Sequence, residues 1–571
     1  MSRTSGRLRR VDSWMRRPLG RWGRLTLLVA MLSAPWVLFF DPIAPFAGAH
    51  IPRDPLAISR VYSDDFAFVA ASRDLSRTIG NLFVPHITHI VPAWRALTWF
   101  LVTCAGSLER VPEVLAVASY GILVATMGLV GRFVARETAN EVAGAAAAVA
   151  TGTTSLMLAS ATWYSAGQPL WASFAAVAAL WYAQDWRRSR SRAALGLCMA
   201  STACAGWFWT IGHLAGPVSA LYLWVDGRRW CRWAAAAPIA ATTLAVGLSL
   251  GLGAGRMDSR VGFHGRTAAE AARPVAGLLH TMQAIPESLV LGNLGLAAET
   301  TPGQGALLTT GLVALWASRR LRRGGPAACN PLEIAGGALM VGSYLVEWTM
   351  RGYLDYQYLR TINAHMLVPW YHVAPQVGWV LFVAGWWSGP RTVDSTRRPS
   401  RPPVRLSRGA AMGVLGFSAV LVTLNRPRVE GLWIASTPPM TASEAARFPI
   451  PELQRMRANA LMLDRAGHQR RHLRRLDLAE KAARSMGIGL DAVHVAFGRV
   501  DAPELPDDYD AADLLDLPER GKVVDPARVR QALGRYLFLE PPPRPAWLEP
   551  GEAWPPASPR DGAEARDAGG R

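Results

Sequence analysis

Ionisable side chains gather in residues 62–94, which read YSDDFAFVAASRDLSRTIGNLFVPHITHIVPAW. The adjacent acids Asp64 and Asp65 could hold a divalent cation such as Mg²⁺ or Mn²⁺, or one of them could act as a general base. Either role suits the transfer of a group from a phosphate-linked donor. The alternative is structural, because Ser63 or Asp64 could cap a helix over residues 66–74.

Two histidines follow in the same stretch. His86 and His89 are three residues apart, so on a helix they would share one face and could hold a metal or donate hydrogen bonds to a phosphate. Pro85 and Pro92 flank them and oppose a continuous helix. Arg95 could clamp a phosphate with its forked donors. The structural alternatives are interfacial histidines without a ligand and an arginine that extends to the membrane surface.

The chain around this stretch is too long and too apolar for one soluble domain. Its 571 residues are 50% hydrophobic, include 23 Trp and have a mean hydropathy of +0.13. The net charge of +19 comes almost wholly from arginines in short runs between apolar segments, so we expect no nucleic-acid partner. The five cysteines show no metal-binding spacing. The composition indicates an all-α polytopic protein of the lipid bilayer.

The apolar segments predict about eleven membrane-spanning helices. A further apolar segment, residues 93–105, is short and is expected to lie in the outer interface. The predicted spans are residues 25–40, 114–130, 142–160, 169–183, 194–209, 211–225, 234–253, 305–317, 332–350, 370–387 and 409–423.

Arginines predict the orientation of these spans. They fill the N-terminal tail and recur in every second connection, so the N-terminus is expected in the cytoplasm and the C-terminus outside. We expect the first helix to stay uncleaved; the alternative is a signal peptide, since Ala47-Gly48-Ala49 resembles a cleavage site. The arginine-rich connections are residues 132–136, 187–192, 228–232, 319–323 and 391–408.

Four regions follow from this topology. Residues 1–24 are expected to form a cytoplasmic basic tail, and residues 25–425 a transmembrane domain whose first outside loop is 41–113. Residues 426–540 are predicted to form a small, mainly helical extracytoplasmic region, and residues 541–571 a disordered tail rich in Pro and Gly.

Ionisable residues are few within the predicted spans. A coupled transporter would be expected to carry charged sites near the membrane midplane, often at broken helices. The polar concentration on the outer face instead favours chemistry on a membrane-borne substrate. The ionisable residues within the spans are His213, Glu333, Glu347 and His372.

The motifs resemble those of the GT-C superfamily, the polytopic glycosyltransferases that use polyprenyl-phosphate sugars. The resemblance covers residues 25–425. It lies in the acidic pair Asp64-Asp65 soon after the first helix, in the segment His86-Ile-Thr-His89-Ile-Val-Pro92-Ala-Trp-Arg95, and in Trp370-Tyr371-His372-Val-Ala-Pro375.

The resemblance implies an inverting or retaining transfer of a sugar from a polyprenyl-phosphate donor to a cell-envelope acceptor, at the outer face of a bacterial inner membrane. It makes Asp64 or Asp65 the base or a metal ligand. It assigns substrate binding to His86, His89, Arg95, Tyr371 and His372. The alternative class is a non-catalytic membrane component or a transporter for envelope polysaccharide or lipid.

Overall fold

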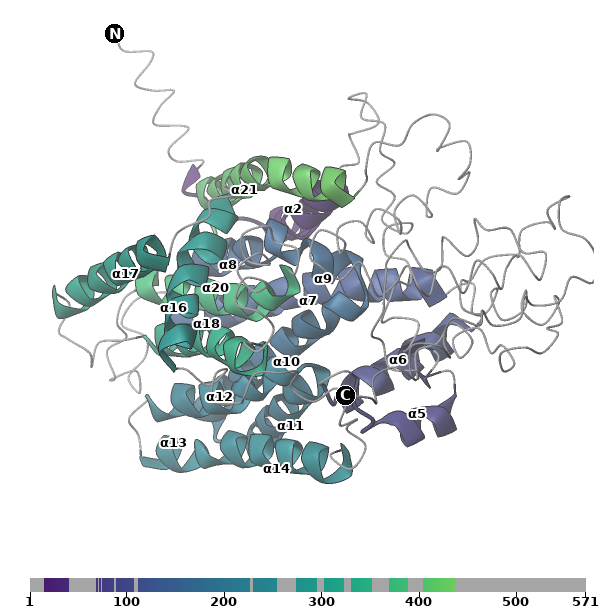
Figure 1. Cartoon of the computed structure of the whole chain (residues 1–571). Helices are drawn as coiled ribbons and strands as arrows, with labels where there is room; N and C mark the ends of the chain where they lie inside the picture. Colours follow the sequence, from purple (N-terminus) through teal and green to yellow (C-terminus); the bar gives the residue numbers. More distant parts are fainter. Residues whose placement is uncertain are drawn as a thin grey trace, which may run out of the picture. The chain divides into compact units, whose positions relative to one another are not determined.

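The structure is a computed structural model (Figure 1). Its described residues form helices joined by turns, and no strand beyond isolated bridges occurs in that part of the chain. The all-α prediction is confirmed to that extent. The structure describes residues 15–40, 68–69, 71–72, 74–86, 89–106, 111–225, 229–253, 274–294, 302–322, 330–351, 369–388 and 404–436.

The chain divides into two compact units. The first comprises residues 1–60, 71–101 and 115–431, and every contact discussed below lies within it. The second comprises residues 61–70, 102–114 and 432–571. The acidic pair Asp64-Asp65 and the residues beyond Ser436 lie outside the described residues, so the predicted C-terminal regions stay predictions.

The helical elements follow one another along the chain as α2 (Arg21–Phe40), α5 (Leu75–Asn81), α6 (Pro92–Ala105), α7 (Val111–Thr138), α8 (Glu141–Gly152), η3 (Ser155–Met157), α9 (Leu158–Thr162), η4 (Ser165–Gly167), α10 (Gln168–Ser189), α11 (Arg192–Phe208), η5 (Thr210–Leu214), α12 (Ala215–Trp224), α13 (Arg229–Ala234), α14 (Ala236–Gly253), α16 (Pro274–Ala284), η8 (Ile285–Leu291), η9 (Gly292–Leu294), α17 (Pro302–Arg322), α18 (Pro331–Arg351), η11 (Pro369–His372), α20 (Val373–Ser388) and α21 (Arg408–Ser436).

Several of these helices have the length and composition of membrane spans. There are four in the described residues, or five if the bent pair α8 and η3–α9 counts as one. The described part is therefore that of a helical membrane protein, and the total of eleven stays a prediction. The four are Arg21–Phe39, Val114–Thr138, Arg229–Gly253 and Arg408–Arg426.

The segment predicted as one span over residues 142–160 is a broken helix. It bends by 56° between α8 and η3–α9. Thr154 starts the new helix, because its hydroxyl accepts a hydrogen bond from the Leu156 N–H at 3.4 Å. At the end of α8, Gly152 lies so close to Met127 that a side chain there would clash. The prediction of a continuous helix was wrong because the Thr-Thr-Ser run caps a second helix without interrupting the apolar pattern.

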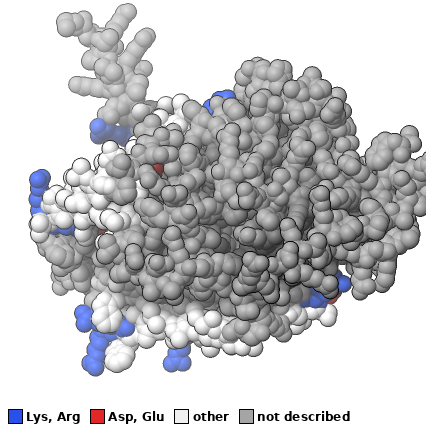
Figure 2. Space-filling model, in the orientation of Figure 1, with Lys and Arg blue, Asp and Glu red and all other residues white. Residues whose placement is uncertain are grey.

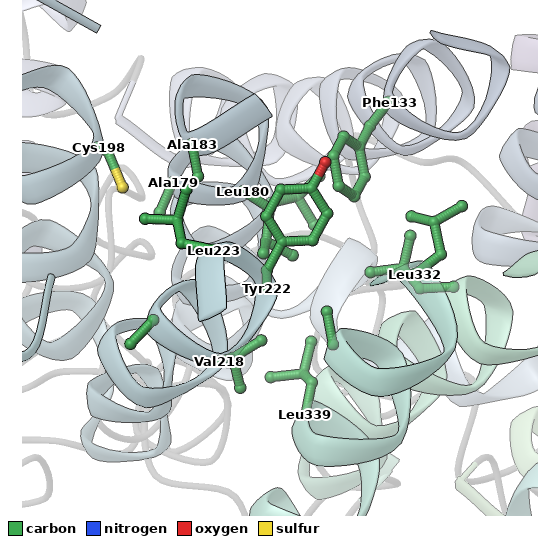
Figure 3. Close-up of a cluster of buried hydrophobic side chains, with 14 of the residues drawn as sticks. Phe133, Ala179, Leu180, Ala183, Cys198, Val218, Tyr222, Leu223, Leu332 and Leu339 are labelled. Atoms are coloured by element: carbon green, nitrogen blue, oxygen red, sulfur yellow. The ribbon is translucent and has the colours of Figure 1, made fainter. Parts of the chain in front are cut away.

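A buried apolar core joins α7, α10, α12, α18 and α20. Figure 3 shows the Tyr222 ring directed toward Phe133, and the two ring centroids are 5.8 Å apart. Leu180, Leu223 and Leu339 are each at most 2% exposed in the same cluster. Burial of these side chains holds the helices that carry the residues of the site.

Reciprocal glycines set the closest approach of α18 and α20. A Cβ on Gly336 would lie 2.5 Å from the Gly378 carbonyl oxygen, and a Cβ on Gly378 would lie 2.7 Å from the Gly336 oxygen. Gly131 of α7 and Gly144 of α8 are in the same relation, since a Cβ on Gly131 would lie 2.9 Å from the Gly144 oxygen. Small residues of this kind let membrane helices approach closely.

Four segments that carry arginines lie side by side, and we call this region the arginine-rich end. A backbone hydrogen bond of 2.9 Å joins Leu19 to Leu406, and an ion pair joins Arg136 to Asp185. Their proximity agrees with alternating spans, which return every second connection to one side. The side of the membrane that they face stays a prediction. The segments are residues 17–24, 136–141, 185–190 and 404–408.

Candidate functional site

His86 and His89 close a tight turn rather than lying on a helix. The His86 N–H donates to the His89 carbonyl at 2.8 Å, and the His89 N–H donates to the His86 carbonyl at 2.9 Å. Such a pair places both side chains on the same side of the turn, with Cβ atoms about 5 Å apart. The two histidines therefore do not share a helix face, in keeping with Pro85 and Pro92, which oppose a continuous helix.

Two residues that directly follow α11 fix the His89 side chain. Its Nδ1 lies 2.7 Å from the Thr210 hydroxyl oxygen, and its ring stacks on Trp209 with centroids 4.5 Å apart. His86 and His89 are each 6% exposed. The turn is therefore buried against the junction of α11 and η5.

The end of α14 closes over the same turn. A Cβ on Gly253 would lie 2.5 Å from Ile90 Cδ1 and 2.8 Å from the Phe83 carbonyl oxygen. Any larger residue at this position would displace the turn. Gly253 thus allows α14 to hold the backbone on both sides of the histidine pair.

Arg95 lies in the first turn of α6 and is 5% exposed. Its Nη2 donates to the Val84 carbonyl at 3.1 Å, so one guanidinium donor holds the start of the histidine turn. The neighbouring Trp94 stacks on Tyr164 at 4.3 Å between centroids, which fixes α6 itself. The predicted phosphate contact of Arg95 stays a prediction, and the structure adds a role in positioning the turn.

Tyr371 and His372 form the end of η11 and join the histidine turn to α18. The Tyr371 ring centroid lies 6.1 Å from that of Trp209. The His372 Nδ1 lies 3.0 Å from the Tyr344 hydroxyl, and the His372 side chain is fully buried. A further edge-to-face contact of 6.2 Å joins Tyr344 to His280. We call the resulting series the aromatic–histidine chain: His89, Trp209, Tyr371, His372, Tyr344 and His280.

His280 ends this chain in α16, which lies outside the candidate spans. Burial lowers the pKa of His280 to about 4. An apolar environment disfavours the charged imidazolium, so this ring is neutral at neutral pH. The His280 ring itself therefore adds no positive charge to the site.

Three amide side chains support the start of α20 and the break after α8; we call Asn293, Gln376 and Asn425 the amide network. Gln376 and Asn293 exchange hydrogen bonds of 2.7 and 3.0 Å, and Gln376 also donates to the Ala150 carbonyl at 2.9 Å. Asn425 accepts from the Ser155 N–H at 3.1 Å. Backbone groups freed by the break are thereby satisfied away from water.

The amide network also positions η11. Gln376 lies in the first turn of α20, directly after Tyr371 and His372. η11 itself packs on η3 and α9, the second half of the broken helix. The bend in the α8–α9 segment therefore provides the surface on which Tyr371 and His372 lie.

The structure connects all five predicted site residues that it describes. His89, Tyr371 and His372 belong to the aromatic–histidine chain. His86 and Arg95 reach it through the histidine turn, His86 by its backbone pair with His89 and Arg95 by its bond to Val84. The acids Asp64 and Asp65 lie outside the described residues, so their roles as base or metal ligand stay predictions. In the part of the chain that is described, no group of three or more His, Cys, Asp or Glu could hold a metal ion.

Sequence reasoning missed Trp209, Thr210, Tyr344 and His280. Trp209 and Thr210 fall at the junction of the predicted spans 194–209 and 211–225. A polar and an aromatic residue at so tight a junction could have indicated that this junction carries contacts of the site. Tyr344 and His280 lie within apolar stretches, where the local sequence gives no sign of their contacts.

Comparison with known proteins gives one distant likeness. No protein-family model and no curated protein matches the sequence. Among solved structures, the chain is similar to the archaeal oligosaccharyltransferase AglB from Archaeoglobus fulgidus in complex with an inhibitory peptide and a dolichol-phosphate, at 14% identity and a TM-score of 0.34. The match covers 92% of this chain and 65% of that one. A likeness of this strength carries no argument about fold or function.

Proposed function

We propose that the protein is a membrane glycosyltransferase of the GT-C type, transferring a sugar from a polyprenyl-phosphate donor to a cell-envelope acceptor on the outer face of a bacterial inner membrane. One observation carries the proposal: Trp209 contacts both His89 and Tyr371. These two residues belong to separate motifs of the GT-C resemblance. Because both motifs contact one indole, they can act on one substrate.

The side chains suit the two parts of such a donor. The Arg95 fork and the imidazoles of His86 and His89 are suited to a phosphate, which accepts charge-assisted hydrogen bonds. The rings of Trp209 and Tyr371 offer flat surfaces beside hydrogen-bonding groups, as the amphipathic face of a sugar requires. Phosphate and sugar would then be held side by side.

In an inverting transfer, the residues proposed account for every bond that breaks and forms. The bond between the sugar C1 and the phosphate oxygen breaks, and its electron pair leaves with the polyprenyl phosphate. The acceptor hydroxyl oxygen forms the new bond to C1, and its proton passes to the carboxylate of Asp64 or Asp65. A retaining transfer is the alternative stereochemistry.

Donor binding tests the proposal. The full-length protein in neutral-lipid nanodiscs would be titrated with polyprenyl phosphate and, as control, with polyprenol. We expect Arg95→Ala to weaken phosphate-dependent binding by about tenfold, as loss of charged hydrogen bonds implies. Asp64→Ala and Asp65→Ala should abolish transfer and leave membrane insertion intact, with a smaller effect on donor binding.

Two controls separate donor contact from loop positioning. Arg95→Lys keeps the charge but loses the fork, so it should bind the phosphate less well than wild type and better than Arg95→Ala. Arg77→Ala removes an exposed arginine paired with Asp74 at 3.5 Å and should leave donor binding unchanged. Wild-type turnover in both Asp variants would refute the catalytic assignment.

Trp209→Leu tests the observation that carries the proposal. It removes the ring that contacts His89 and Tyr371, and donor binding should fall by about tenfold because two aromatic pairs are lost. Trp209→Phe keeps an aromatic ring and should retain most of the binding. Trp387→Ala, at an indole that is 72% exposed, should have no effect. Unchanged binding in Trp209→Leu would count against a donor site here.

The broken α8–α9 segment favours the second candidate, a transporter or non-catalytic component for envelope lipid or polysaccharide. Broken helices with polar groups are typical of transporter substrate sites. This function predicts lipid or polysaccharide movement across proteoliposomes that survives Asp64→Asn and Asp65→Asn. Failure of the wild type to bind polyprenyl phosphate would also favour it over the glycosyltransferase.

A further inference from the structure

A group of tryptophans and arginines lies where α10 ends and where α12 leads into α13. We call it the Trp–Arg face: Trp186, Arg190, Trp224, Trp230, Arg232 and Trp233. Figure 2 shows basic side chains at the lower left edge of the molecule, where α13 lies, with uncharged surface between them. None of these residues belongs to the aromatic–histidine chain or the amide network.

Indole rings hold both arginines of this face. The guanidinium carbon of Arg190 lies 3.5 Å from the ring centroid of Trp230 and 5.4 Å from that of Trp186. The guanidinium carbon of Arg232 lies 5.5 Å from the ring centroid of Trp224. Stacking on a ring uses the flat face of a guanidinium and leaves the N–H donors around its edge for an anion.

The charges of this face differ from other arginines of the bundle. Arg24, Arg136 and Arg187 each form an ion pair with a carboxylate. Within the described residues, neither Arg190 nor Arg232 does so. Among the described residues, the Trp–Arg face is therefore a positive surface on which no carboxylate pairs with Arg190 or Arg232; Asp226 lies outside the described residues.

The apolar surface beside the face continues along the helices. Trp224, Trp230 and Trp233 are 55%, 51% and 73% exposed. Aromatic rings exposed to this extent at the end of a candidate span are typical of the headgroup level of a bilayer. Exposed aliphatic side chains follow on α11 and α14, as a lipid-facing surface requires: Leu197, Ile239, Leu244 and Leu248.

We propose that the Trp–Arg face is a binding site for an anionic phospholipid. The guanidinium edges of Arg190 and Arg232 take the headgroup phosphate, the indoles lie at the ester level, and the acyl chains run along α11 and α14. Arg192 and Arg229 are exposed nearby and add to the positive potential that selects an anionic over a zwitterionic lipid. This site is independent of the glycosyltransferase proposal.

Lipid retention tests the site in the full-length protein. Nanodiscs of phosphatidylcholine, with and without a minority of phosphatidylglycerol, would supply protein for native mass spectrometry. We expect the wild type to retain phosphatidylglycerol, and the variant Arg190→Gln with Arg232→Gln to retain about thirtyfold less, as the loss of two basic residues near the surface implies. The matched control is Arg24→Gln, which removes an arginine that already pairs with Glu141 and should retain as much as the wild type.

Arg232→Gln alone keeps the test valid if the double variant does not fold, because Arg232 is exposed. It should retain about fivefold less phosphatidylglycerol. Equal retention by the wild type and Arg232→Gln would overturn the proposal. So would a wild type that shows no preference for phosphatidylglycerol over phosphatidylcholine.

Discussion

The arginine-rich end and the aromatic–histidine chain hold their polar groups in different ways. At the arginine-rich end, a buried carboxylate meets a full set of partners: Glu137 accepts hydrogen bonds from Gln184 and Tyr222 and pairs with Arg187 at 3.5 Å. In the aromatic–histidine chain, most of the described contacts join rings to rings and to hydroxyl groups, although the buried acids Glu287 and Glu347 also act on Tyr344. One region pairs charges with one another, and the other is built mainly from ring contacts.

A second buried pair on α17 and α18 follows the first pattern. Arg320 and Glu333 form an ion pair in which both side chains are at most 4% exposed. Glu333 also accepts a hydrogen bond from the Asn330 N–H at 3.2 Å, while Asn330 caps α18 through the Leu332 N–H at 3.0 Å. This reciprocal cap ties the ion pair to the start of a helix.

The two regions should therefore respond differently to substitution. Changes at the arginine-rich end should act on stability, and changes in the aromatic–histidine chain on recognition. Removing one partner of a buried ion pair costs about 3–5 kcal/mol, because the other charge stays buried without compensation. An aromatic pair contributes only about 0.5–1.5 kcal/mol beyond its burial. Changes at the ion pairs should therefore destabilise the protein strongly, whereas conservative changes in the aromatic–histidine chain should alter binding in a folded protein.

The largest effect is expected for Glu137→Ala. This change leaves Arg187 without its carboxylate and removes the acceptor of the Tyr222 hydroxyl. We expect a loss of about 3–5 kcal/mol, seen as a strong drop in the thermal midpoint and in the recovery of monodisperse protein. Glu137→Gln keeps an acceptor and should fall between Glu137→Ala and the wild type.

An exposed acid provides the matched control. Asp74→Ala removes an exposed cap of α5 that accepts from the Arg77 N–H at 2.7 Å, and it should cost about 1 kcal/mol or less. If Glu137→Ala were no more harmful than Asp74→Ala, the arginine-rich end would not be the stabilising region of this comparison.

Gln376→Leu should give the next largest effect, because the amide network links the fold to the site. It leaves the Ala150 carbonyl and the Asn293 side chain without a buried donor, at about 1–3 kcal/mol for each group left unsatisfied. We expect a lower thermal midpoint together with weaker donor binding, since Gln376 lies in the first turn of α20, which directly follows η11.

A double variant checks the cause of that loss. Gln376→Leu with Asn293→Leu removes both members of the exchanged amide pair, so its loss should be smaller than the sum of the single losses. Additive losses would mean that the two amides do not act together. If Gln376→Leu bound the donor as the wild type does, the amide network would not support the site.

Hydropathy predicted much of the helical framework. The span predicted at 234–253 corresponds to α14, Ala236–Gly253, and the one at 169–183 lies within α10, Gln168–Ser189. The break in the α8–α9 segment was not predicted, because the Thr-Thr-Ser run that caps the second helix does not interrupt the apolar pattern, and the amides that satisfy the freed backbone groups come from other helices. Apolar patterns record burial in lipid, and they do not record which helices meet.

The site was predicted only in part for the same reason. The motifs drew attention to His89 and Tyr371, but the residues that connect them, Trp209 and Thr210, belong to no motif. Their contacts join segments that are far apart in the chain. The spacing of His86 and His89 left open how the two side chains lie, and the structure pairs the two residues across a turn.

The smallest effect is expected for Thr210→Val, which tests whether the aromatic–histidine chain can change binding without changing the fold. Valine keeps the volume but loses the 2.7 Å contact with His89 Nδ1. Loss of one neutral hydrogen bond should weaken polyprenyl-phosphate binding by about fivefold and lower the thermal midpoint only slightly.

Thr423→Val is the control for Thr210→Val, since the Thr423 hydroxyl only donates to its own helix, at the Ala419 carbonyl. It should bind the donor as the wild type does. Equal binding by Thr210→Val would mean that the orientation of the His89 ring is irrelevant to the donor. A loss as large as that of Arg95→Ala would instead mean that the Thr210 hydroxyl contacts the donor itself, because orienting a ring is worth less than a charged hydrogen bond.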